Sequence, residues 1–125
     1  MPPVPAPLRI SAVSQFVPDH SDPKNGRYFF AYRITIENRG AAPVQLISRH
    51  WVITDANHKV EEVRGEGVIG EQPVIPPGKA YSYTSFCPLR TDFGTMHGTF
   101  RMRGEAGDFD AEIPQFILSC DNTVN

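Results

Sequence analysis

The segment Gly65 to Gly70 reads Gly-Glu-Gly-Val-Ile-Gly and has the glycine spacing of a dinucleotide-binding loop. Such a loop binds phosphate because its last glycine begins a helix, whose first amides and dipole face the anion. Pro73 and the pair Pro76-Pro77 follow within a few residues, and proline lacks the amide donor and interrupts a helix. The motif therefore argues against a nucleotide site of the helical kind, and we expect no cofactor.

The same loop suggests a weak site for phosphate or pyrophosphate. Backbone amides next to residues of positive φ can converge on an anion without a helix, and neighbouring cations would add counter-charge. The interpretation that we favour is that the glycines bend the chain sharply between two sheets, helped by Pro73, while Glu66 and Glu71 repel an anion. The residues of the anion site would be Gly65, Gly67, Gly70, Arg64 and Lys79.

The histidines offer little support for a metal site. His20 lies beside Asp19 and Asp22, but this cluster is more typical of a solvated polar turn. None of the four histidines has a second ligand at the spacing that transition metals use, and we predict no metal site. The histidines are His20, His50, His58 and His97.

The cysteines do not indicate catalysis. Cys87 lies between Phe86 and Pro88, and Arg90 is the only cation near it in the sequence. A reactive thiolate needs a cationic neighbour or a helix start, so we expect a small packing residue. Cys87 and Cys120 form no Cys-x-x-Cys pair, which predicts neither a disulfide framework nor structural zinc. We therefore predict a cytoplasmic protein that is not an enzyme.

Length and composition indicate one domain of ordinary size. The chain has 125 residues, of which 40% are hydrophobic, and its 12 prolines and 10 glycines leave no room for a long amphipathic helix. A net charge of −2 gives no general attraction to nucleic acid or to anionic lipid, so we expect neither nucleic-acid binding nor membrane insertion. We expect a proline-rich tail over residues 1–7, without the features of a signal peptide, a domain over 8–118 and a flexible tail over 119–125.

Alternating hydrophobic residues predict strands. The clearest runs from Tyr28 to Asn38, and a strand over Leu8 to Phe16 should pair with it in antiparallel fashion across a polar loop, Asp19 to Gly26. A third strand covers Val44 to Thr54. We expect Ile47, Trp51 and Ile53 to share its core side, with Arg49 as the exception and Trp51 as a central packing residue.

Turn residues divide the rest of the chain into further short strands. The segment Asp55-Ala56-Asn57-His58 predicts a hairpin into Lys59 to Arg64, and Pro76-Pro77-Gly78-Lys79 predicts a second turn. About seven strands without a long helix predict an antiparallel β-sandwich of immunoglobulin or fibronectin type III style, with a partly open barrel as the alternative. The remaining predicted strands are Tyr81 to Cys87, Met96 to Arg103 and Phe109 to Leu118, the last two joined by Gly104 to Asp108.

Three separated segments carry a specific resemblance. Arg49 to Asn57, Val63 to Pro73, and Pro88-Leu89 with Gly94 to Gly98 are similar in order and spacing to the ApaG family of small bacterial proteins. The resemblance covers about Leu8 to Leu118. It implies a fibronectin type III-like sandwich, a genetic association with cobalt and magnesium resistance, and a gene neighbourhood shared with a diadenosine tetraphosphate hydrolase.

The resemblance also leads to the function that we expect. Related domains occur in larger eukaryotic proteins, F-box proteins among them, which implies a module for protein contacts. The chain departs from the family pattern at His58 and Phe86, where relatives often carry glycine. We predict a non-catalytic module that binds an unknown partner protein through its edges and loops, and self-association is a further possibility. Aromatic and arginine residues concentrate binding energy at interfaces, and the candidates are Phe29, Tyr81, Tyr83, Arg90, Phe93, Arg101 and Arg103.

Overall fold

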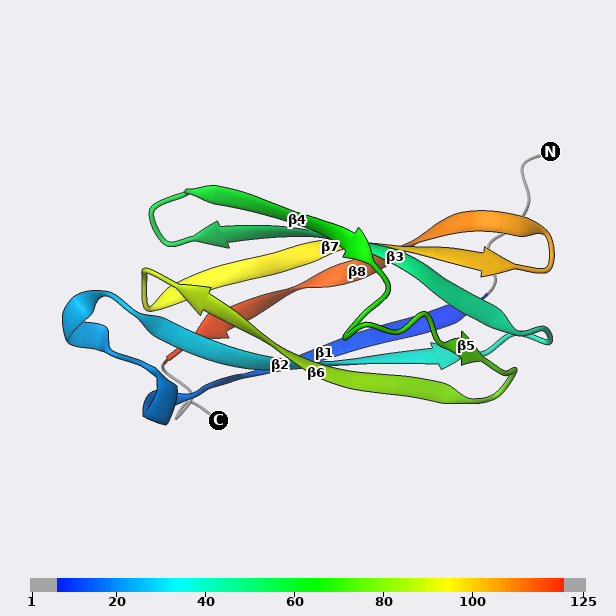
Figure 1. The fold of residues 1–125 in the computed structure, drawn as a ribbon, viewed down its shortest axis with the longest axis horizontal. Helices are drawn as coiled ribbons and strands as arrows, with labels where there is room; N and C mark the ends of the chain where they lie inside the picture. The colour runs from blue at the N-terminus through cyan, green and yellow to red at the C-terminus, as the bar shows by residue number, and fades with distance from the viewer. Residues whose placement is uncertain (1–6, 121–125) are drawn as a thin grey trace.

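The computed structural model describes residues 7–120 as two antiparallel β-sheets that face each other, as the sequence predicts (Figure 1). Most of both predicted tails lies outside the described residues. Residues 7–120 contain two 3-10 helices of three residues each, and neither of them could span a membrane. The elements are β1 (Leu8–Phe16), η1 (Pro18–His20), η2 (Pro23–Asn25), β2 (Tyr28–Asn38), β3 (Val44–Asp55), β4 (Val60–Glu66), β5 (Val74–Ile75), β6 (Ala80–Leu89), β7 (Phe93–Gly104) and β8 (Gly107–Ser119).

The first sheet has the order β1-β2-β6. Its central strand is β2, in which every second residue from Phe30 to Ile36 is buried, because these side chains point into the space between the sheets. The predicted pairing of β1 with β2 is confirmed, with Phe16 opposite Phe30. The same alternation therefore defines the core side of all three strands.

The second sheet has the order β4-β3-β7-β8, and β5 adds to β3. The register of β3 against β7 shifts between Leu46 and Ser48, which is the mark of a β-bulge. Before the bulge Leu46 is buried, and after it Trp51 is buried. The prediction that Ile47 shares the core side with Trp51 is therefore wrong, because the extra residue changes which positions point inward.

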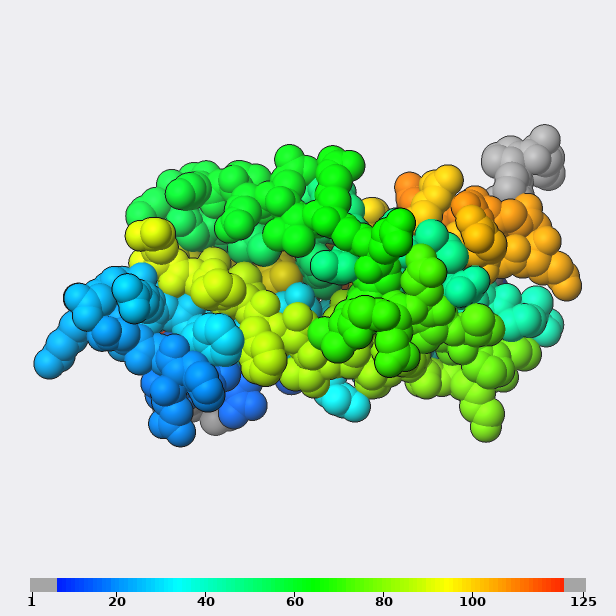
Figure 2. All heavy atoms as spheres, viewed as in Figure 1, coloured from blue at the N-terminus to red at the C-terminus, as the bar shows by residue number. Residues whose placement is uncertain are grey.

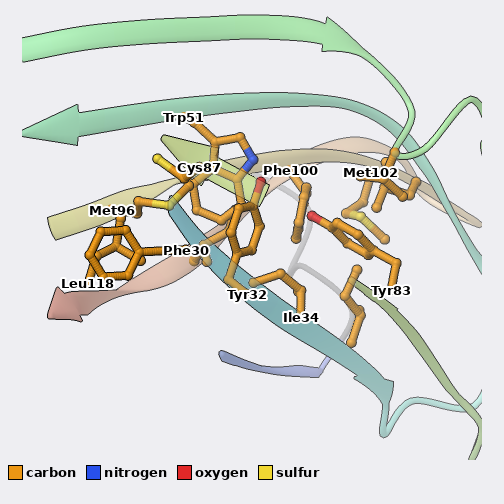
Figure 3. Packing of buried hydrophobic residues seen from close by; sticks show 14 of the residues in the cluster. Phe30, Tyr32, Ile34, Trp51, Tyr83, Cys87, Met96, Phe100, Met102 and Leu118 are labelled. Carbon is orange, nitrogen blue, oxygen red and sulfur yellow. The ribbon is translucent and has the colours of Figure 1, made fainter. Parts of the chain in front are cut away.

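Trp51 lies at the centre of the core, as predicted. Its ring packs edge-on against Tyr32, Phe100 and Phe116, with ring centres 5.5, 6.2 and 5.9 Å away. Figure 3 shows Trp51 and Phe100 of the second sheet beside Tyr32 and Tyr83 of the first. Such edge-to-face contacts add to the burial of apolar surface, so Trp51 holds the two sheets together.

The two long sides of the sandwich differ. On one side β1 lies beside β8, and the Ser14 hydroxyl donates a hydrogen bond of 2.6 Å to the carbonyl oxygen of Ile117. On the other side β4 and β6 are the outer strands of their sheets, and the chain between β4 and β5 passes between them (Figure 1). Two outer strands, β4 and β6, therefore border this side of the sandwich.

Candidate functional site

The edge of β4 is charged, whereas the edge of β6 is not. Four of the seven residues of β4 carry charge, in the sequence Val-Glu-Glu-Val-Arg-Gly-Glu. The ten residues of β6 read Ala-Tyr-Ser-Tyr-Thr-Ser-Phe-Cys-Pro-Leu and contain no charged side chain. Charges on an outer strand discourage pairing with another chain, so β6 has the edge that is more open to strand addition.

Hydrogen bonding determines which groups of β6 point to this edge. In an antiparallel pair, successive residues point their backbone groups alternately toward the neighbouring strand and away from it. The Asn38 amide donates to the carbonyl oxygen of Lys79 at 2.9 Å, so the odd-numbered residues bond to β2. Pro88 lies at an even-numbered position, where a donor to β2 is not required. In the middle of β6, the outward N–H and C=O groups belong to Ser82, Thr84 and Phe86.

These outward groups are free within the described chain. β6 pairs with β2 alone, and no backbone hydrogen bond from residues 7–120 outside the sheet reaches the outward groups of Ser82, Thr84 or Phe86. Thr84 and Phe86 are exposed. The edge therefore presents a row of unpaired donors and acceptors to solvent.

Aromatic side chains lie beside this edge on the outer face of the first sheet. The rings of Phe29 and Phe86 stack with centres 5.3 Å apart, and the His20 ring lies 5.6 Å from that of Phe29. Phe86 is 56% exposed, which is a large exposure for a phenylalanine. Phe86 thus contributes to an apolar surface next to the free edge of β6.

Cationic residues surround the uncharged strand. Lys79 directly precedes β6 and Arg90 directly follows it. On the outer face, Arg33 of β2 lies opposite Thr84 and donates a hydrogen bond of 3.3 Å to its hydroxyl. Among residues 7–120 none of these three cations takes part in an ion pair.

A pocket of about 490 Å³ continues the edge beyond the end of β6. It lies where η2, the β3–β4 hairpin and the β6–β7 turn meet, at the left of Figures 1 and 2. Its charged and titratable lining comprises His20, Arg27, Asp55, Lys59, Glu61 and Arg90, and its other lining residues are Asn25, Gly26, Tyr28, Phe29, Ile53, Pro88 and Leu89.

The structure brings together two of the predicted interface residues. Phe29 and Arg90 line the same pocket. Tyr83 is only 7% exposed, so its assignment to the surface is corrected: it lies opposite Ile34 on the core side of the sheet. The alternation within Tyr81 to Cys87 does not reveal which side is the core.

The other predicted interface residues lie apart from this pocket. Arg101 and Arg103 are on β7, where they form ion pairs with Asp110 and Asp108 of β8 at 3.1 and 2.8 Å. Their guanidinium groups are therefore already engaged within the second sheet. Two aromatic residues remain: Phe93 is 42% exposed at the start of β7, and Tyr81 is partly buried against the core.

The glycine segment forms a tight hairpin. The Gly67 amide donates to the carbonyl oxygen of Ile47 at 2.8 Å, and Val68 and Glu71 exchange two backbone hydrogen bonds. Ile69 and Gly70 between them have φ values of 50° and 75°, which are the left-handed conformations of a two-residue turn. The geometry agrees with the sharp bend that we favoured, and the Gly67 amide is not available to an anion.

Arg49 is the cation that contacts this segment. Its Nη1 donates hydrogen bonds to the carbonyl oxygens of Glu66 and Gly67 at 3.1 and 2.8 Å, while the guanidinium lies over Gly65, where a Cβ would collide with it. Arg64 instead contacts Glu62 at 3.4 Å. Arg49 thus has a structural role, which explains an arginine on the inward side of β3.

Polar atoms in the core are not arranged for catalysis. Within the described part of the chain, the Trp51 Nε1 and the Tyr83 hydroxyl are buried without a hydrogen-bond partner. Burial raises the pKa of the Tyr83 hydroxyl, and it raises the pKa of the Cys87 thiol from 9.0 to about 12. A thiol with a raised pKa is a poor nucleophile at neutral pH, so Cys87 is a packing residue.

The histidines lie in different parts of the structure. His50 on β3 contacts Glu62 on β4 through its Nε2 at 2.7 Å, and this hydrogen bond lowers the pKa of the Glu62 carboxyl. His58 has a φ of 67° in the β3–β4 turn. Within residues 7–120 no group of three or more His, Cys, Asp or Glu side chains is placed to hold a metal ion.

Sequence reasoning missed the main features of this region. Arg27, Arg33 and Lys59 were not singled out, because the strands and turns that carry them come together only in the fold. One signal was present in the sequence, since the predicted strand Tyr81 to Cys87 has no charged residue and Pro88 follows it directly; in the structure this proline belongs to β6. Proline in a strand is typical of an outer strand, and this could have marked β6 as an edge.

Comparison with known proteins gives close matches over nearly the whole chain. The model of the ApaG domain family matches residues 18–104. Proteins named Protein ApaG from Dechloromonas aromatica and Aromatoleum aromaticum are 53% and 56% identical over 119 residues, with 94% of each chain covered. A crystal structure described as an ApaA protein from Bordetella pertussis has a TM-score of 0.91 and 47% identity, covering 98% of this chain and 100% of that one. None of these names states an enzymatic activity.

Proposed function

The chain belongs to the ApaG family, and we propose that it is a non-catalytic binding module whose β6 edge takes up an extended segment of a partner protein. The observation that carries this proposal is the row of free backbone groups at Ser82, Thr84 and Phe86 on an uncharged outer strand. An extended segment can pair with such an edge and gain main-chain hydrogen bonds, while the neighbouring side chains give specificity.

The side chains beside β6 favour a foreign segment over a second copy of this chain. Two copies of β6 paired antiparallel about Thr84 would place Lys79 of one copy close to Arg90 of the other at both ends of the new ladder. Like charges at such short range oppose pairing. A partner segment is free of this repulsion, and the exposed Phe86 ring gives it an apolar contact on the outer face.

We further propose that the module acts in the cytoplasm and catalyses no reaction. The association with cobalt and magnesium resistance would then be an effect of the partner that is bound.

Peptide selection followed by a backbone substitution tests the proposal. Random ten-residue peptides displayed on phage are selected on the whole protein, and the recovered sequences are synthesised with a fluorescent label. We expect bound peptide to slow hydrogen exchange at the amides of Ser82, Thr84 and Phe86. We also expect Thr84→Pro to weaken binding at least about tenfold, because it removes an outward donor and its ring obstructs the incoming strand.

A matched control uses the other edge. The Asp55 amide donates to the carbonyl oxygen of Lys59, so the even-numbered residues of β4 point outward, and Arg64→Pro changes an outward position there. This variant should bind the peptides as the wild type does. Recovery of no peptide, protection of amides elsewhere, or equal binding by Thr84→Pro would each overturn the proposal.

A further inference from the structure

The pocket at the end of β6 shares its wall with the proposed docking edge. Pro88 and Leu89 belong to β6, and both line the pocket together with Arg90. A segment that pairs with Ser82, Thr84 and Phe86 and continues in the same direction would therefore reach it. The recess lies between the end of β6 and the β3–β4 hairpin, toward the left of Figure 2.

The pocket is lined by more cationic than anionic side chains. Three permanent cations, Arg27, Lys59 and Arg90, line it together with two carboxylates, Asp55 and Glu61. One Asp55 oxygen already accepts hydrogen bonds from the amides of Asn57 and Lys59, at 2.8 and 2.9 Å. Within residues 7–120 none of the three cations forms an ion pair, so positive charge in the pocket remains available to a ligand.

The walls of the pocket are joined to each other. The amide of Ala56 in the β3–β4 turn donates a hydrogen bond of 3.1 Å to the hydroxyl of Thr91 in the β6–β7 turn. The Thr91 hydroxyl in turn donates to the carbonyl oxygen of Phe93 at 2.7 Å. Gly26 after η2 faces the carbonyl oxygen of Arg90, which a Cβ at this position would contact. A preformed site loses less entropy when it binds a ligand.

We infer that this pocket receives an aspartate or glutamate side chain of the segment docked on β6, so that the partner is an acidic peptide; the inference rests on the proposed function. A carboxylate matches the guanidinium groups of Arg27 and Arg90, which can donate charge-assisted hydrogen bonds to it. The apolar part of the lining, which includes Phe29 and Ile53, would contact the methylene groups of the same side chain.

Paired peptides test this inference separately from docking itself. Each peptide selected on the wild-type protein is synthesised with its acidic residue, with the matching Asn or Gln, and with either a free or an amidated C-terminus. Binding is measured by fluorescence anisotropy against the wild type, Arg90→Gln and Arg9→Gln. Arg9 on β1 is exposed and lies outside the pocket, so Arg9→Gln is a control that removes the same charge.

The acidic peptide should bind the wild type about tenfold more tightly than its amide counterpart, a preference that Arg90→Gln removes and Arg9→Gln retains. The preference should decrease with added salt. Equal binding of acidic and amide peptides that still protect β6 would overturn this inference and leave docking intact. Affinity that is lost only when the C-terminus of the peptide is amidated would also overturn the inference, since the pocket would then bind a terminal carboxylate. Failure to select any peptide would refute the docking proposal itself.

Discussion

The outer strands β4 and β6 face the same side of the sandwich but differ in chemistry. β4 carries Glu61, Glu62, Arg64 and Glu66, whereas β6 carries only uncharged side chains over ten residues. Both strands have every second backbone unit directed to solvent, so geometry alone does not distinguish them. The difference shows that on this side of the sandwich the fold leaves unpaired backbone at two edges and carries charge, which discourages pairing, at only one of them.

The two strands also differ on their inward sides. β6 places Tyr83, Cys87 and Leu89 in the core, while β4 has no fully buried residue. β6 is therefore held to the domain by both its ladder and its side chains. An edge anchored in this way can accept another strand without leaving its own sheet.

The largest expected effect is on stability, and it distinguishes residues of β6 that hydrogen-bond to β2 from residues whose backbone groups point outward. Ser85→Pro should destabilise the protein by about 3 kcal/mol or more, because residue 85 lies opposite Tyr32 and bonds to β2. Thr84→Pro should cost much less, because its N–H points outward. Urea denaturation of both variants measures this difference.

Ser85→Ala is the control for this pair, because it removes the Ser85 hydroxyl and keeps the backbone amide. Its cost is subtracted from that of Ser85→Pro. Equal destabilisation by Thr84→Pro and Ser85→Pro would show that the assigned hydrogen-bond alternation, and with it the free edge of β6, is incorrect.

A smaller effect tests the inward side of β6. Tyr83→Phe should raise the free energy of unfolding by about 1 kcal/mol at pH 7, since the buried hydroxyl has no hydrogen-bond partner among residues 7–120. Burial also raises the pKa values of Tyr83 and Cys87, so the unfolded state loses protons first as pH rises. The stability of the wild type should therefore fall between about pH 9 and 12.

Tyr83→Phe removes one of these groups and should make the decline above about pH 10 less steep. Denaturant unfolding at a series of pH values from 7 to 11 measures both effects. The wild type, measured in the same series, is the reference. A variant that is less stable at pH 7 would show that the hydroxyl is satisfied and that the inward side of β6 is differently packed.

The smallest effect concerns the charged edge of β4. Glu62 accepts a hydrogen bond from His50, which lowers its pKa, and a carboxyl with a lowered pKa stabilises the folded state above its ordinary pKa. Glu62→Gln should therefore lower the melting temperature slightly at pH 7, with the two proteins converging below about pH 4. Differential scanning calorimetry measures this. If the difference in melting temperature between the two proteins instead grew as the pH was lowered, the assigned contact between His50 and Glu62 would be excluded.

Much of the fold is predictable from local patterns. Alternation over Tyr28 to Asn38 located β2 and its core side, and the residues Asp55 to His58 located the hairpin between β3 and β4. The bulge after Leu46 was not predictable, because one extra residue in β3 is defined only by its pairing with β7. The core side of a strand therefore requires knowledge of its partner.

The candidate site was harder to predict from the sequence than the fold. Phe29 and Arg90 were chosen as interface residues and are found lining one pocket, but Tyr83 was placed on the surface because β6 has aromatic residues on both of its sides. Arg27 and Lys59 come from different loops, and no pattern in one segment indicates that they share a pocket. Edge position and pocket composition are properties of the assembled sheets.

Pro88 sets a limit on how long a bound strand can be. Because this residue has no amide hydrogen, the complete donor–acceptor pairs on the outward ladder of β6 end at Phe86, and the row on which docking is proposed runs from Ser82 to Phe86. That distance is about 13 Å in extended chain, or roughly five residues of a ligand. Recognition on this scale suits short linear motifs, which exchange rapidly and can be carried by many unrelated proteins.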